Sequence, residues 1–144
     1  MSEDLFALSR FIQAQEDVYE LALAELQSGK KRSHWMWFIF PQFDGLGFSQ
    51  TSKYFAIKSI EEAKAYLEHP LLGPRLLECA EAVMKVEGRS ANDILGSPDD
   101  SKLKSCATLF DHAAGPGLVF DRLLEKYFQG KRDGKTLKLL GSEN

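Results

Sequence analysis

Apolar side chains recur every three or four positions along most of this chain, which is the spacing of one face of an α-helix. The first such stripe runs from Leu8 to Leu26, and its helix should end near Gly29. Its members are Leu8, Phe11, Ile12, Tyr19, Ala22 and Leu26. Gln15 lies within this stripe, where a buried amide must find hydrogen-bond partners. We expect Gln15 either to bond to backbone inside the core or to point into a polar cavity.

Capping signals indicate where two further helices begin and end. Ser59 with Glu62 three residues later has the pattern of a capping box. The helix that follows must end by His69, because the next residue is a proline. Pro74 suits the first turn of another helix, which should end near Gly88.

The C-terminal half has similar signals for where helices begin and end. A serine at the start of residues 90–96 can cap a single helical turn, and Ser97-Pro98 should begin a longer helix, with Ser97 as its cap. Residues 115–117 interrupt that helix, and another stripe runs from Val119 to Phe128. Asp133 can cap a last short helix.

One apolar run, Trp35 to Phe40, has no period and fits either a buried helix or a strand. A second short run, Tyr54 to Ile57, could pair with it as a hairpin. We favour the other interpretation, because two isolated strands are only marginally stable and the rest of the chain lacks strand patterns. The sequence therefore predicts an all-α fold, with residues 1–144 forming a single domain of five to seven helices.

Composition and charge narrow the functions open to this chain. A hydrophobic fraction of 44% with 27% charged residues is typical of a folded protein. A net charge of −3 argues against a nucleic-acid partner, because nucleic acids are also negatively charged. No signal-peptide pattern or membrane-length apolar stretch is present, so we expect a cytoplasmic protein that makes no membrane contact. Cys79 and Cys106 fall on helical stripes and should be buried thiols. Because the cysteines and histidines lack metal-ligand spacing, we expect no metal and no cofactor.

The run Ser33–Gln42 holds the strongest candidate for a binding site. It places both tryptophans of the chain beside His34, and the rings of Trp35, Trp37 and Phe38 cannot all face one side of a helix. At least one ring could therefore form the wall of a cavity, although the run could instead simply fill the core. The candidate ligand-binding residues are His34, Trp35, Trp37, Gln42, Ser49 and Ser52.

Polar residues near the run Ser33–Gln42 could accept a hydrogen bond from a buried indole or bind an anion. A buried indole N–H needs an acceptor, and His34, Gln42 and Ser49 are close by in the sequence. The Gly-rich loop 45–52 could offer N–H groups and hydroxyls to an anion, with the basic residues 30–32 nearby. It lacks the ending of a P-loop, so we favour an ordinary turn there and a solvated helix end at residues 30–32.

A second group of candidates comes from the C-terminal half. Lys102 and Ser105 share one helix face, and Asp133 could approach them. A lysine beside a serine sometimes marks an activated nucleophile, but the spacing equally suits a surface lysine. Asp133 should then either pair with Lys102 or cap its helix. With Gln15, these three residues are the secondary candidates.

Together these residues predict a protein that binds a small polar ligand, phosphate- or nucleotide-containing molecules included, in an aromatic-lined pocket. The alternative is an interaction module that presents a helical groove to a protein partner. The sequence specifies no reaction. For any catalysis, His34 is the first candidate as general acid or base, because the unperturbed pKa of histidine lies near neutrality.

The chain resembles a family of small uncharacterised bacterial proteins, domain of unknown function 1810. The aromatic decamer Ser33–Gln42 is the most specific part of the resemblance, which continues along almost the entire chain. The matching segments are Gly45-Leu46-Gly47, Ser49, Glu62-Ala63, Ala65-Tyr66-Leu67, His69-Pro70, Arg75-Leu76, Lys102-Leu103, Thr108-Leu109-Phe110, Asp133 and Thr136-Leu137. The resemblance implies a mainly helical fold, similar to a short α-α superhelix, and no known catalytic residues.

Two features qualify this resemblance. Similar sequences sometimes carry the label calpastatin, a disordered protease inhibitor, and the amphipathic helices and aromatic residues of this chain argue against that label. The resemblance also implies a pair of serines before Thr108, where this chain has Ser105-Cys106. That departure weakens any role for a hydroxyl at position 106.

Overall fold

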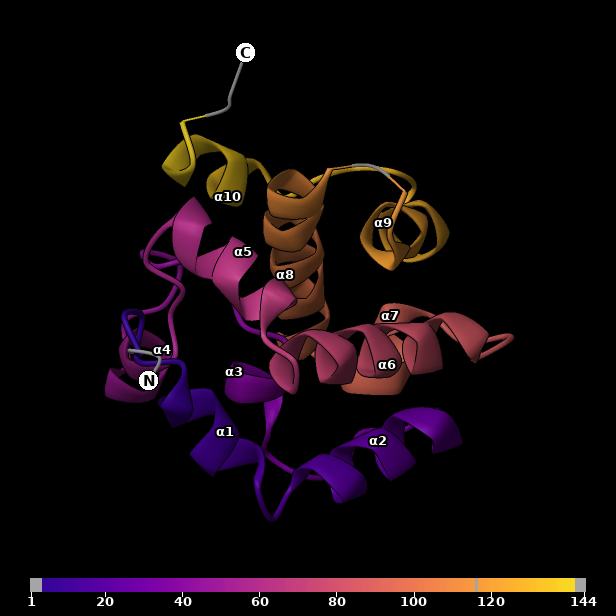
Figure 1. Cartoon of the computed structure of the whole chain (residues 1–144). Helices are drawn as coiled ribbons and strands as arrows, with labels where there is room; N and C mark the ends of the chain where they lie inside the picture. The colour runs from indigo at the N-terminus through magenta and orange to yellow at the C-terminus, as the bar shows by residue number, and fades with distance from the viewer. Residues whose placement is uncertain (1–3, 116, 142–144) are drawn as a thin grey trace.

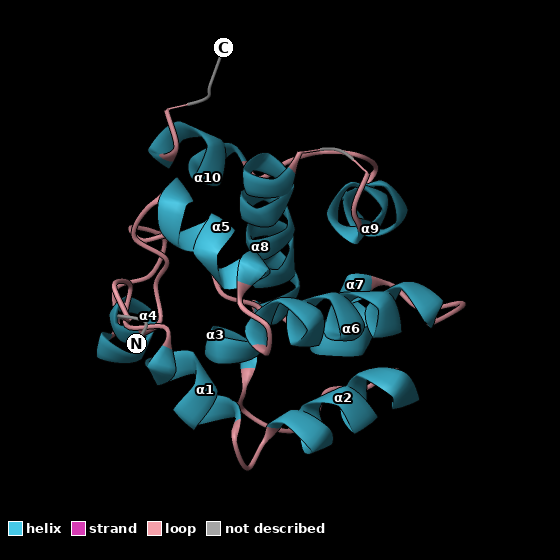
Figure 2. Cartoon of the chain, in the orientation of Figure 1, coloured by secondary structure: helices cyan, strands magenta, loops and turns pink. Residues whose placement is uncertain are grey.

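A computed structural model describes residues 4–115 and 117–141, and every regular element within these ranges is a helix (Figures 1 and 2). The helices are α1 (Ser9–Gln15), α2 (Tyr19–Ser28), α3 (Met36–Ile39), α4 (Gln50–Tyr54), α5 (Ile60–Glu68), α6 (Leu72–Lys85), α7 (Ala91–Leu95), α8 (Asp99–Ala114), α9 (Val119–Phe128) and α10 (Gly134–Leu139). The all-α prediction is confirmed. The ten described helices outnumber the expected five to seven for two reasons. The first stripe is divided into α1 and α2, and α3 and α4 have only four and five residues, too few to show a period.

Polar caps begin several helices where the sequence predicts them. The Ser59 hydroxyl accepts the N–H of Glu62 at the start of α5. Ser90 and Asp93 form a complete capping box at α7. The Asp133 carboxylate caps α10. These local signals need no tertiary context, because each cap satisfies an N–H group of its own first turn.

Two boundaries differ from the expected ones. The stripe from Leu8 to Leu26 is divided into α1 and α2 by turns at residues 16–18, which let α1 pack against α3 while α2 packs against α6. α8 begins at Asp99, one residue later than predicted, and Pro98 occupies the N-cap position in place of Ser97. Pro98 makes no side-chain cap bond. The expected serine cap is therefore wrong.

The ambiguous run at residues 35–40 forms the short helix α3, so the hairpin does not form. Between the described residues there is one isolated parallel bridge, which joins Phe43 to Ile57. The backbone bonds around it run from Ile57 N–H to the Gln42 carbonyl at 2.9 Å and from Asp44 N–H to the Ile57 carbonyl at 2.9 Å. This pairing holds the loop after α3 against the segment before α5.

A single hydrophobic cluster joins α1, α2, α3 and the helices from α5 to α9. α8 stands at the centre of the fold, with α5 and α10 on one side and α9 on the other (Figure 1), and it contacts all three. Cys79 and Cys106 are buried free thiols, as predicted, and burial raises the pKa of Cys79 to about 12. None of the described helices combines the length and apolar character that crossing a membrane requires.

Candidate functional site

An open cleft of about 680 Å³ lies where α3, the loop after it, the N-terminal half of α8 and the start of α10 come together. Small-molecule sites commonly span roughly 300–1,000 Å³, so the cleft has room for a metabolite. Its lining residues are Trp37, Gln42, Leu46, Gly47, Pro98, Ser101, Lys102, Ser105, Asp133, Gly134 and Lys135. Five of the residues singled out from the sequence therefore border one space.

Trp37 and Lys102 form one side of the cleft. The Lys102 ammonium lies 3.4 Å from the centre of the Trp37 ring, in cation-π contact. The same ammonium is 3.2 Å from the Asp99 carboxylate, one turn earlier on α8. Trp37 is half-buried, so part of its ring remains open to the cleft. The indole thus offers an apolar wall with a positive charge fixed against it.

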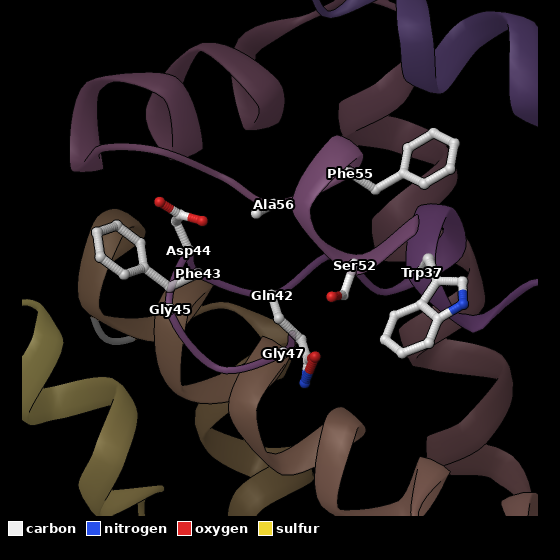
Figure 3. A pocket seen from close by; sticks show the side chains of 9 residues that line it. All are labelled: Trp37, Gln42, Phe43, Asp44, Gly45, Gly47, Ser52, Phe55 and Ala56. Atoms are coloured by element: carbon white, nitrogen blue, oxygen red, sulfur yellow. The ribbon is translucent and has the colours of Figure 1, made fainter. Parts of the chain in front are cut away.

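Gln42 and Gly47 form the adjoining wall. The Gln42 carbonyl is held by the Ile57 N–H, while its side-chain amide extends toward Gly47 (Figure 3). A Cβ on Gly47 would lie 2.6 Å from the Ser52 side chain, which leaves no room for a larger residue. Behind this contact is a hollow of about 10 Å³, lined by the nine residues of Figure 3. That volume approaches the space needed for one water molecule, about 10–15 Å³.

Ser105 and Asp133 also line the cleft. The buried Ser105 hydroxyl donates to the Ser101 carbonyl at 3.1 Å, so its proton is engaged with backbone. The Asp133 carboxylate accepts the N–H of Thr136 at 2.9 Å and its hydroxyl at 2.6 Å. Lys102 pairs with Asp99 rather than with Asp133. Of the two roles considered for Asp133, the structure shows the helix cap, and this geometry gives no activated serine nucleophile.

Trp35 turns away from the cleft into the core. Its ring is fully buried, and its Nε1–H donates to the Glu25 carboxylate at 2.9 Å. Glu25 also accepts the backbone N–H groups of Arg32 and Ser33 and the Ser33 hydroxyl. Burial alone would raise the pKa of Glu25, but the hydrogen bonds from Ser33, Arg32 and Trp35 outweigh it and lower the pKa to about 2. The acceptor of the Trp35 indole N–H is thus Glu25 on α2. The candidates from the sequence, His34, Gln42 and Ser49, do not have this role.

The remaining candidates lie outside the cleft. His34 is exposed, and Ser49 is an exposed cap of α4 that accepts the N–H of Ser52 at 3.1 Å. Ser52 lines the small hollow rather than the cleft. Gln15 is a core amide, which donates to the Phe38 carbonyl at 2.7 Å. His34, Ser49 and Gln15 therefore do not line the cleft, while Ser52 shares the small hollow with Trp37 and Gln42.

Asp99 and Lys135 were not candidates from the sequence, and Lys31 was considered only as one of the basic residues 30–32. Lys135 lines the cleft, and Lys31 pairs with Asp99 at 2.9 Å. The expected solvated helix end at residues 30–32 is thus wrong for Lys31, whose side chain is only 8% exposed. In the sequence Asp99 has the ordinary place of an acid in the first turn of a helix, and nothing there indicates a partner some 70 residues away.

Comparison with known proteins agrees with the fold. A family model described as "Protein of unknown function (DUF1810)" matches residues 5–140. The chain is similar to the conserved hypothetical protein Rv1873 from Mycobacterium tuberculosis, whose crystal structure has a TM-score of 0.94 and 51% sequence identity. The match covers 96% of this chain and 99% of that one. No curated protein matches the chain.

Proposed function

Because the chain belongs to the DUF1810 family of proteins of unknown function, we propose its function from the cleft itself. The protein binds a small polar ligand between the Trp37 wall and the polar groups of α8 and α10. The main support for this proposal is that three distant parts of the chain line one cleft of suitable volume. They contribute Trp37 and Gln42, Lys102 and Ser105, and Asp133.

The lining residues have complementary chemistry. The open part of the Trp37 indole suits an apolar or planar group, while the Gln42 amide can both donate and accept hydrogen bonds. Ser105 donates to a carbonyl but keeps its oxygen lone pairs for a ligand donor. Asp133 uses its Oδ2 as the helix cap, which leaves Oδ1 for a ligand hydroxyl. An apolar wall with a few convergent polar groups is the usual composition of a small-molecule site.

The cysteines support a location for this activity. Cys79 and Cys106 are both free thiols. Free thiols suit a reducing compartment, so we place the protein in the cytoplasm, where small polar metabolites are abundant.

Docking of a protein partner remains the alternative use of the surface. Its anchors would be exposed apolar side chains. In the described residues, four of these lie in turns and loops (Leu5, Phe48, Leu71 and Leu118), and the other three lie on separate helices. Leu21 is on α2, Tyr54 is on α4 and Leu139 is on α10. Because no two of these three share a helix, they favour the cleft over a helical groove as the binding surface.

The two tryptophans provide a direct test. Tryptophan emission and thermal unfolding would be followed with glucose, glucose 6-phosphate, adenosine and AMP. A probe that binds in the cleft should change the emission of the native protein, because Trp37 borders the site. In Trp37→Phe the buried Trp35 still emits, so the same probe should raise the unfolding temperature while leaving the emission unchanged.

Two results would contradict the proposal. A probe that changes the emission of Trp37→Phe as strongly as that of the native protein acts elsewhere. Failure of the whole panel, and of a wider metabolite screen, to shift either signal would show that the cleft is not a ligand site.

The expected effect of binding is large enough to measure. A probe present at 100 times its dissociation constant should raise the free energy of unfolding of the native protein by about 2.7 kcal/mol.

A further inference from the structure

Two lysines share one carboxylate at the edge of the cleft. The Lys31 ammonium lies 2.9 Å from Asp99 Oδ2, and the Lys102 ammonium lies 3.2 Å from Asp99 Oδ1. The exposed fractions of the three side chains are 8%, 17% and 18% for Lys31, Asp99 and Lys102. We call this group the lysine–aspartate triad. Its three charges are largely removed from water, so they act on one another with little screening.

Each ammonium of the triad also lies over a tryptophan. Lys31 is 5.1 Å from the centre of the Trp35 ring, and Lys102 is 3.4 Å from that of Trp37. Trp35 is held in turn by its hydrogen bond to Glu25. The Lys31 backbone N–H donates to the Ile94 carbonyl at 2.7 Å, which anchors the segment to α7. Contacts with buried parts of the fold therefore fix the position of Lys31.

The triad has a net charge of +1, since two ammonium groups face one carboxylate. Lys102 is the member that lines the cleft, so the surplus charge is presented there. The other charged lining residues, Asp133 and Lys135, have opposite charges and cancel. Asp100 accepts hydrogen bonds from the Ser101 N–H and the Asn92 amide, and it does not line the cleft. Without Lys31, the remaining pair of Asp99 and Lys102 would be neutral.

We propose that the ligand of the cleft is an anion and that Lys31, which lies outside the cleft, supplies the charge that selects it. This inference rests on the proposed function, and it names the ligand class as small molecules with a phosphate or carboxylate group. The anionic group lies against Lys102, whose ammonium has three N–H donors and only one carboxylate partner. Lys31 is a positioning residue: it neutralises Asp99 so that Lys102 remains effectively positive.

Anionic and neutral quenchers test the charge of the cleft without any ligand. Iodide concentrates where the potential is positive, whereas acrylamide does not respond to charge. Trp35 is fully buried, so quenching reports on Trp37. Lys31→Gln should lower the ratio of iodide to acrylamide quenching about two- to fourfold, the effect of one unit charge roughly 10 Å away in a high dielectric. Lys31→Arg should preserve the ratio, because the charge is kept.

Lys64→Gln is the matched control, because it removes the same charge from an exposed position on α5. Its quenching ratio should equal that of the native protein. An unchanged ratio in Lys31→Gln would overturn the role of Lys31. An equal fall of the quenching ratio in Lys31→Gln and Lys31→Arg would also overturn this role, because the effect would then come from packing rather than charge.

Matched ligand pairs separate this inference from the proposed function. Glucose 6-phosphate and AMP should bind more tightly than glucose and adenosine. Lys31→Gln should weaken only the phosphorylated members, about four- to sixteenfold, because a phosphate carries nearly two charges where iodide carries one. Gluconate shows whether a carboxylate suffices in place of the phosphate. Tight binding of a neutral member, unaffected by Lys31→Gln, would sustain the cleft as a ligand site and overturn the anion assignment. Binding by no member, and by no compound of the wider metabolite screen, would instead contradict the proposed function.

Discussion

One carboxylate organises the segment that leads to the cleft. Glu25 accepts four hydrogen bonds, from the N–H groups of Arg32 and Ser33, the Ser33 hydroxyl and the Trp35 indole. Four donors aimed at one anion overcome the cost of burying it, which is why its pKa falls although burial opposes ionisation. The turn between α2 and α3 therefore depends on a single side chain, and α3 in turn presents Trp37 to the cleft.

Glu25→Gln should lower the free energy of unfolding at neutral pH by about 2–4 kcal/mol, because an amide N–H₂ would face N–H donors in place of an oxygen. The pKa of Glu25 is lowered from 4.5 to about 2, so its ionised form stabilises the fold above pH 4.5. This contribution is lost as the pH falls toward 2. Urea unfolding between pH 7 and pH 2.5 would measure both effects.

The native protein should therefore lose more stability than Glu25→Gln across the acidic range. Glu20→Gln is the control, because Glu20 is exposed on the same helix and its replacement should change the stability by less than about 0.5 kcal/mol. Parallel pH profiles for native protein and Glu25→Gln would refute the importance assigned to this carboxylate.

At the scale of elements, α5 and α6 approach each other more closely than ordinary side chains allow. Gly73, in the first turn of α6, is fully buried against the end of α5. A Cβ at this position would fall within the contact distance of the Leu67 carbonyl, which is backbone and cannot rotate away. The turn from His69 to Leu72 therefore requires glycine at position 73 for steric reasons, and not for an unusual backbone angle.

Gly73→Ala should destabilise the protein by about 2–4 kcal/mol, because α5 and α6 must separate or distort to admit a methyl group. Gly134→Ala is the matched control. Gly134 is in the first turn of α10, and nothing lies within 4 Å of a Cβ built there. The control should be neutral, or more stable by up to about 1 kcal/mol. Equal stability of the two variants in thermal unfolding would contradict the close approach.

At the scale of the whole molecule, one cluster of buried side chains connects nearly all the helices. The cluster includes Phe11 of α1, Tyr66 of α5 and Phe110 of α8, whose rings contact one another in sequence at centroid distances of 5.1 Å and 5.5 Å. No second cluster is described that could unfold by itself. The cleft lies at the edge of this core, where short helices and loops meet the start of α8.

A single core predicts a single unfolding transition. Helix content followed by circular dichroism and Trp35 burial followed by fluorescence should give the same urea midpoint, within error. The reason is that Trp35 is fully buried in the cluster that stabilises the helices. A fluorescence transition at clearly lower urea than the loss of helix would show that the segment around α3 unfolds separately.

The sequence alone determined the fold class, most helix starts and five residues of the cleft. Caps such as Ser59 and Ser90 act within one turn, and amphipathic stripes state which face each helix buries, so both can be recognised without neighbours. The aromatic run predicted that at least one of its rings could form the wall of a cavity, but it did not indicate which one. The division of α1 from α2 was not predictable, because the stripe continues through the turn and only packing against α3 and α6 separates the halves.

Only the tertiary structure decided which polar groups meet. Glu25 and Trp35 are ten residues apart, and Lys31 and Asp99 are far more distant. The first pair nevertheless forms a buried contact and the second a largely buried one. In the sequence each of these charges has a local explanation at a helix end or on a solvated face. Partner choice for a charge depends on which surfaces the core brings together, and periodicity carries no information on that. The sequence thus determined the helices, and their packing determined the site.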